Sequence, residues 1–190
     1  MKKKGVIILA AVIAVIAVIA ISLVSSYNGV VDKEEAVKTA GSSISVQLQR
    51  RADLIPNFVN TVKGYSDYEQ STFTAVTEAR AKVSNASGAA EQAEASAQLD
   101  SAIDVWVNAV TEAYPELKAN EQYKALQDEL AGTENRIAVA RKDYNDAAQK
   151  YNKSVRRFPA SIAAGIFGFD EVEYFEADAG VNQAPTVNFD

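Results

Sequence analysis

Apolar residues recur every three or four positions along most of this chain, which is the spacing of amphipathic helices. Four such stretches follow one another, at about residues 30–65, 66–88, 89–113 and 120–158. No alternating pattern typical of a β-strand occurs before the C-terminal tail. The pattern therefore predicts an all-α protein whose four helices form an elongated antiparallel bundle, with two long and two shorter helices.

The N-terminus departs from this pattern because residues 5–24 carry no charge and are rich in Val, Ile, Leu and Ala. Twenty residues at about 1.5 Å each span roughly 30 Å, the hydrocarbon thickness of a bilayer. The apolar part of a signal peptide is shorter, about 7–15 residues, although Ala20-Ile21-Ser22 leaves cleavage open as an alternative. We expect residues 5–24 to be a retained single-pass transmembrane helix.

The charges that flank this span predict its orientation. Lys2, Lys3 and Lys4 precede it, and no basic residue follows it before Lys33. The positive-inside rule then places residues 1–4 in the cytoplasm and the main domain outside the cytoplasm.

Local signals predict where the bundle helices begin and end. Ser66-Asp67-Tyr68-Glu69 has the spacing of a capping box, which would start the second helix after Gly64. Pro115 would stop the third helix, Asn120 would cap the start of the fourth, and Pro159 would end it. We expect the bundle to occupy residues 27–158.

The predicted lengths leave part of the bundle incomplete. The first and fourth helices would each be about 55 Å long, whereas the second and third would reach only about 30–38 Å. The half near the membrane would thus contain two helices and the far half four. Two helices cannot bury all the apolar residues of the near half, namely Val30, Val37, Ala40, Ile44, Tyr144, Tyr151, Val155 and Phe158. We expect the C-terminal tail, a second copy or another protein to cover them.

Residues 159–190 begin with an apolar segment and end in an acidic tail. The apolar part would form a short helix that folds back onto the two near helices, or that contacts the membrane or a neighbouring subunit. Ile166, Phe167 and Phe169 are therefore candidate interaction residues, together with Val37, Ile44, Tyr144, Tyr151, Val155 and Phe158. Residues 170–190 carry six acidic side chains and no basic one, which argues against tight contact with anionic lipid.

Arg51 lies at the edge of the apolar face of the first bundle helix, and Pro56 lies in the interior of that helix. We expect Arg51 to lay its aliphatic stem on that face and to pair with Glu78 or Glu134. Pro56 cannot donate to the carbonyl of Ala52 and would bend the helix around the bundle. The alternative is an anion site formed by Arg51 and its neighbour Arg50.

The composition narrows the possible chemistry. The chain contains no Cys and no His, so thiol nucleophiles, imidazole bases and most zinc sites are excluded. We expect no enzyme activity, no cofactor and no metal site. With 25 acidic against 19 basic residues, three of them before the span, the domain is not expected to bind nucleic acid.

Several long segments resemble the LemA family. They are VQLQRRADLIPNFVNTVKGYSDYE, TAVTEARAK, AYPELKANEQYKALQDELAGTENRIAVARKDYNDAAQKYN and FPASIAAGIFGFDEVEYFEA. The resemblance covers about residues 27–190 and implies an N-terminal membrane helix, an antiparallel helical domain and no established catalytic activity. Some relatives are associated with membrane remodelling in magnetosome formation, and others are encoded near membrane proteases. Gly41 stands where the family has a tryptophan, and Tyr68 where it has a histidine.

Two functions follow as expectations. The first is a scaffold in the bacterial inner (cytoplasmic) membrane that forms homo-oligomers at the membrane surface and organises the cell envelope. The alanines of the span would allow close packing of its helices in lipid. The second is a monomeric adaptor or regulator that binds another envelope protein, such as a membrane protease. Its tail at Ala184–Phe189 could add as a strand to a partner's sheet.

Overall fold

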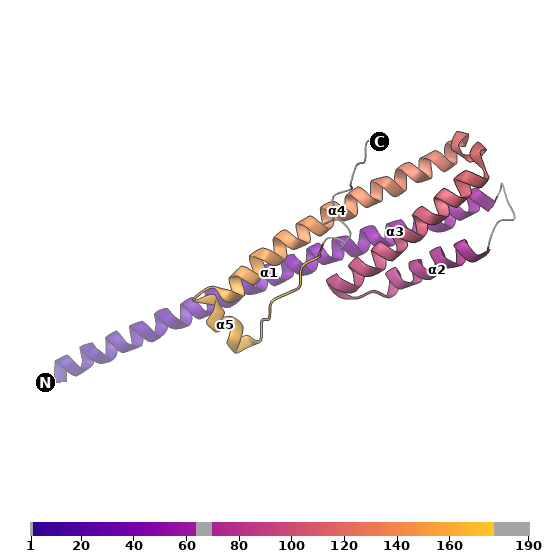
Figure 1. Ribbon diagram of the computed structural model, residues 1–190. Helices are drawn as coiled ribbons and strands as arrows, with labels where there is room; N and C mark the ends of the chain where they lie inside the picture. The colour runs from indigo at the N-terminus through magenta and orange to yellow at the C-terminus, as the bar shows by residue number, and fades with distance from the viewer. Residues whose placement is uncertain (1, 64–69, 177–190) are drawn as a thin grey trace, which may run out of the picture. The chain divides into compact units, whose positions relative to one another are not determined.

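The computed structural model describes residues 2–63 and 70–176, and these residues contain helices, turns and an extended C-terminal segment but no strand (Figure 1). The all-α fold class is therefore confirmed. The elements are α1 (Lys2–Lys63), α2 (Gln70–Asn85), α3 (Gly88–Ala113), the 3₁₀-helix η1 (Pro115–Ala119), α4 (Glu121–Arg156) and α5 (Ala160–Phe167).

The apolar span and the first bundle helix, which the sequence predicts as separate elements, form one continuous helix of 62 residues. The polar residues between them do not end the helix, because Ser, Asn and a single Gly each cost about 1 kcal/mol or less in a helix interior. Lys33 Nζ also donates to the carbonyl of Gly29 at 2.7 Å across this junction. Pro56 lies inside α1, as predicted, while the bend at Pro56 stays a prediction.

The described residues divide into two compact units. The first, called here the two-helix unit, comprises residues 2–40 and 144–173. The second, the four-helix unit, comprises residues 41–63, 70–143 and 174–176. The two-helix unit contains one part each of α1 and α4 together with α5, whereas the four-helix unit contains the other parts of α1 and α4 and all of α2 and α3.

Three aromatic rings from different helices form the centre of the four-helix unit. Phe58 on α1 lies 5.1 Å from the ring of Trp106 on α3 and 5.0 Å from that of Tyr123 on α4. The hydroxyl of Tyr123, which is buried with the ring, lies 2.9 Å from Thr111 Oγ1. The three rings therefore join three helices through one set of contacts.

Most predicted helix ends are confirmed. Asn120 Oδ1 accepts from the backbone N–H of Tyr123 at 2.9 Å, which makes Asn120 the predicted N-cap. Helix α4 ends at Arg156, shortly before Pro159. The described part of helix α2 has 16 residues and ends at Asn85, three residues before the predicted end. The predicted capping box before α2 lies outside the described residues.

Candidate functional site

Several of the apolar residues predicted to lack a cover are packed inside the two-helix unit. Val37, Tyr151 and Val155 are each less than 8% exposed. The buried Ala164 of α5 lies in the same cluster. Phe169 and Val172, from the segment that follows α5, pack against it. The cover is thus the chain's own C-terminal segment, which was one of the three predicted alternatives.

The other predicted interaction residues are placed differently. Tyr144 is half-buried beside the same cluster, and Ile44 is buried within the four-helix unit. Phe158, Ile166 and Phe167 are more than half exposed. The buried side chains cannot contact a partner in this conformation. An interaction role therefore stays a prediction chiefly for the three exposed side chains.

A buried amide holds the C-terminal segment in place. Asn152 on α4 is 3% exposed, and its side-chain nitrogen donates to the carbonyl of Val172 at 2.8 Å. The same side chain accepts from the backbone N–H of Val172 at 2.9 Å, so both polar groups of one residue are bound. Tyr144 Oη donates to the carbonyl of Glu173 at 3.1 Å. Asn152 was not among the residues predicted from the sequence, although an amide beside the apolar stripe of a helix must find partners when it is buried.

Acidic residues lie near both tyrosines of this cluster. Burial raises the pKa of Tyr151 above its ordinary value, and Glu34 and Asp170 raise it further. Burial also raises the pKa of Tyr144, with a contribution from Glu173. Both phenols therefore remain protonated, and able to donate, throughout the physiological pH range.

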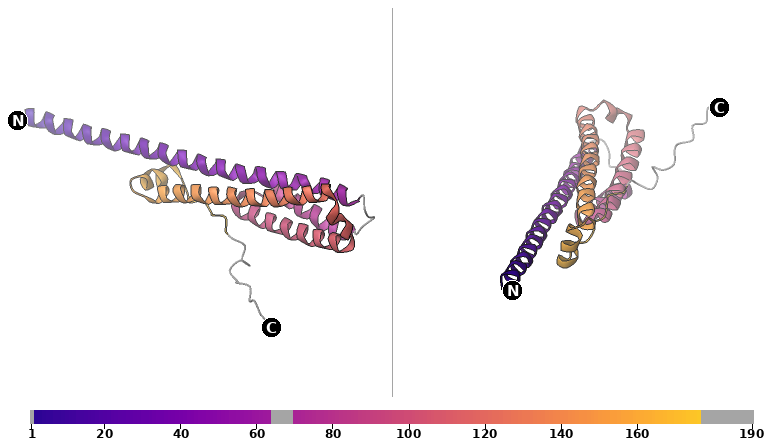
Figure 2. Two further views of the ribbon diagram at one scale, coloured as in Figure 1. Left: turned by 90° about the horizontal axis from the view of Figure 1, so that it is seen from above. Right: turned by 90° about the vertical axis from the view of Figure 1, so that its left-hand side faces the viewer.

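An aromatic cluster joins α1 to the end of α5. The ring of Tyr27 lies edge-on to Phe167 at 4.7 Å and 5.6 Å from the ring of Phe169. Figure 2 shows α5 beside α1, near the point where α4 ends. Tyr27 is only three residues beyond Val24, the last residue of the apolar span. Tyr27 was not among the interaction residues predicted from the sequence, and its position next to the span is the signal that could have identified it.

A second candidate site lies in the four-helix unit, around Arg51. Its side chain is almost completely buried and pairs with Glu134 of α4, as predicted. The expected alternative, Glu78, is not its partner. Arg51 has a second partner that was not predicted, Asp100 of α3. The Oδ1 atom of Asp100 lies 2.5 Å from Nη1 of Arg51. One guanidinium thus links three helices.

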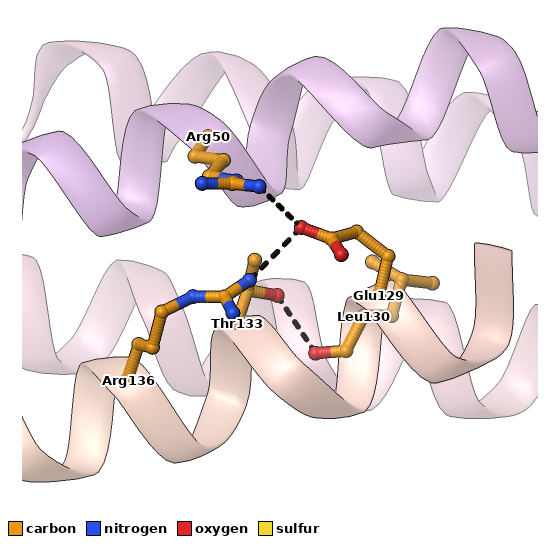
Figure 3. A network of polar contacts seen from close by, with 5 residues as sticks. All are labelled: Arg50, Glu129, Leu130, Thr133 and Arg136. Carbon is orange, nitrogen blue, oxygen red and sulfur yellow. Dashed lines mark hydrogen bonds and ion pairs between the residues drawn. The ribbon is translucent and has the colours of Figure 1, made fainter. Parts of the chain in front are cut away.

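The neighbouring Arg50 also pairs with a carboxylate of the chain. Figure 3 shows Glu129 Oε1 accepting from Arg50 Nη2 at 2.7 Å and from Arg136 Nη2 at 2.9 Å. The hydroxyl of Thr133 donates to the carbonyl of Leu130 at 2.7 Å close by. Since Arg50 and Arg51 both have carboxylate partners, the arrangement favours the structural role over the anion site.

The stability of the four-helix unit is expected to depend on pH through Asp100. Burial raises the pKa of its carboxyl from 3.8 to about 6, although Arg51 acts in the opposite direction. The folded chain therefore binds this proton more tightly than the unfolded chain. Its stabilising effect is complete below about pH 4 and is lost as the pH rises through about 6. We expect the Asp100 contribution to the free energy of unfolding to fall by about 1–3 kcal/mol between about pH 4 and pH 7.

The measurement is chemical unfolding of the wild type and of Asp100→Asn across this pH range. The asparagine cannot titrate, so the difference between the two chains isolates Asp100. A difference that stays constant with pH, or that moves in favour of the wild type as the pH rises, would contradict the expectation.

Together these features define a class, a membrane-associated helical bundle. The apolar part of α1 has a mean hydropathy of 3.3 and is not buried by any other element, which makes it a candidate membrane span. Among the described parts of the chain, no group of three or more acidic side chains is placed to hold a metal ion. The model of the LemA family matches residues 40–189, and the chain belongs to that family.

Curated relatives agree with this assignment. Magnetosome protein MamQ 2 of Paramagnetospirillum magneticum is 28% identical over 82% of this chain and 66% of its own length. Magnetosome protein MamQ of Magnetospirillum gryphiswaldense is 26% identical over 84% of this chain and 68% of its own. Protein LemA of Metamycoplasma hominis is 26% identical over 79% of this chain and 68% of its own length. The chain thus spans only about two thirds of the length of these relatives.

Proposed function

We propose that this chain is a single-pass scaffold that self-associates at the membrane surface and organises the membrane or envelope around it. The N-terminus would lie in the cytoplasm and the bundle outside the cytoplasmic membrane, as the lysines before the span indicate. Two of the relatives described above are named as magnetosome proteins, which agrees with a role in membrane organisation.

The observation that carries this proposal is the absence of a linker between the span and the packed part of the two-helix unit. Residues 2–40 belong to one helix, and Val30 and Val37 of that helix are already buried against the rest of the unit. A flexible linker of Gly and Ser would let a tethered domain search a volume above the membrane. A continuous helix instead holds the unit at a fixed height, which suits a scaffold.

The span itself offers a surface for self-association. Ala10, Ala14 and Ala17 are spaced by four and three residues, so they share one face of α1, and all three are exposed. Small residues at this spacing let two helices approach closely in lipid, where packing rather than the hydrophobic effect drives association. The buried residues around Val37 and Tyr151 are not needed for assembly in this arrangement.

The test is the mass of the full-length protein in mild detergent by light scattering. We expect a discrete oligomer for the wild type and at least a tenfold weaker association for Ala10→Ile, Ala14→Ile and Ala17→Ile combined. The matched control replaces the opposite face conservatively, with Val12→Ile, Val15→Ile and Ile19→Val, and should assemble like the wild type. A wild type with the mass of a monomer would overturn the proposal.

An adaptor that binds another envelope protein, such as a membrane protease, is the second candidate. The observation that favours it is the burial of Val37, Tyr151 and Val155 by the chain's own segment, because a covered surface needs no second copy. A monomeric mass in the experiment above would favour this function. The tail at Ala184–Phe189, predicted to bind the partner, lies outside the described residues.

A further inference from the structure

Helix α5 buries one apolar face and exposes another. Ala163 and Ala164 are 0% and 4% exposed, and Ala164 lies in the buried cluster of the two-helix unit. On the opposite side Ile162 and Ile166 are 46% and 64% exposed, and Phe167, at the C-terminal end of the helix, is 58% exposed. Ile162 and Ile166 are four residues apart, so they lie on the same face of the helix. The exposed face is as apolar as the buried one.

No charged residue occurs in this segment of the chain. The sequence from Phe158 to Phe169 contains none, and Phe158 is itself 76% exposed. The nearest charges are Arg157 before it and Asp170 after it, both exposed. A contiguous apolar surface with a charged rim marks a contact with a membrane or another protein.

The contact between Tyr27 and Phe167 indicates which of these it is. Tyr27 follows Val24, the end of the apolar span, by three residues, or about 4.5 Å along the helix. The headgroup layer on each side of the hydrocarbon is about 5–8 Å thick. Tyr27 therefore lies at the level of the headgroups, where tyrosine is enriched. Phe167, whose ring is 4.7 Å away, must lie at nearly the same level.

We propose that α5 is an interfacial helix that inserts Ile162, Ile166 and Phe167 into the bilayer, at the boundary between headgroups and acyl chains. It enters the leaflet from which α1 emerges. This inference rests on the proposed membrane anchor, because the span is what brings α5 to the surface. Apolar insertion rather than charge drives the contact, since acidic Asp170 and Glu171 follow the helix directly. A neutral phosphatidylcholine surface is therefore sufficient.

The absence of cysteine from the chain allows a direct test. Single-cysteine variants of the full-length protein are labelled with an environment-sensitive fluorophore and reconstituted into phosphatidylcholine vesicles. Ile166→Cys reports on α5, and Val139→Cys, which replaces a similarly exposed residue of α4 in the four-helix unit, is the matched control. Val15→Cys, in the middle of the span, reports on the anchor. Lipids with a shallow spin label quench from the bilayer, and iodide quenches from water.

We expect the Ile166 label to be quenched by the spin-labelled lipid and at least threefold less by iodide than the Val139 label. Neither value should change in high salt. An Ile166 label that is as open to iodide as Val139, while Val15 remains in lipid, would overturn the inference and leave the anchor intact. A shielded Ile166 label without lipid quenching would also overturn it and assign the surface to a second copy. A Val15 label open to iodide would instead refute the anchor, and with it both proposals.

Discussion

Replacing Arg51 with methionine is expected to lower the free energy of unfolding by roughly 3–5 kcal/mol. Methionine keeps most of the length and apolar contact of the arginine stem but removes the charge. Asp100 and Glu134 would then face each other without the guanidinium that now lies between them. Breaking a buried ion pair on one side has this large effect because an uncompensated charge remains in a poorly solvated place.

The control is Arg50→Met on the adjacent residue. Arg50 pairs with Glu129, but its side chain is 57% exposed, so this substitution should change stability by about 1 kcal/mol or less. Adding Asp100→Asn and Glu134→Gln to Arg51→Met should recover most of the loss, because no unpaired charge is left. Unfolding in denaturant, followed by Trp106 fluorescence in detergent, measures all of these. Equal losses at positions 50 and 51 would show that burial of the pair does not matter.

The sequence predicted one of the two partners of Arg51 and missed the other, for a physical reason. The apolar stripes of the helices indicate which residues face the bundle, and they left Glu78 and Glu134 as the expected partners of Arg51. Asp100 directly follows the buried Leu99 on α3, but whether a carboxylate at such a position turns inward depends on the rotation of α3 about its axis. Periodicity does not fix that rotation to within one residue.

The position of the C-terminal segment was also only partly predictable from the sequence. Helix lengths alone showed that two helices could not bury Val37, Tyr151 and Val155, and that something else had to cover them. The apolar pattern is the same whether the cover is the chain's own tail, a second copy or another protein. The hydrogen bonds between Asn152 and the backbone of Val172 favour the chain's own tail as the cover. A single amide that bonds to an extended segment leaves no periodic pattern in the sequence, so this contact could not be predicted.

Phe58→Ala is the second substitution with a large expected effect, a loss of about 3–5 kcal/mol in the free energy of unfolding. Phe58 is 1% exposed and contacts the rings of both Trp106 and Tyr123. Removing its ring leaves a cavity that α3 and α4 can fill only by moving toward α1. Asp100 and Glu134, the partners of Arg51, lie on these same two helices, so such a movement would also disturb the ion pairs.

Trp106 is the only tryptophan of the chain, so its fluorescence reports this cavity without interference. We expect Phe58→Ala to shift the emission of the folded protein to longer wavelength, because water gains access to the indole. Val46→Ala, on the same helix at a residue that is 62% exposed, should stay within about 0.5 kcal/mol of the wild type and leave the emission unchanged. If Phe58→Ala also lowered the free energy of unfolding by no more than about 0.5 kcal/mol, the three rings would not be the centre of the core.

Phe58 lies two helical turns beyond Arg51 on the same face of α1. We therefore expect the double variant Phe58→Ala, Arg51→Met to lose less free energy of unfolding than the sum of the losses of the two single variants. That shortfall would show that the ring cluster and the ion pairs hold one junction of α1, α3 and α4.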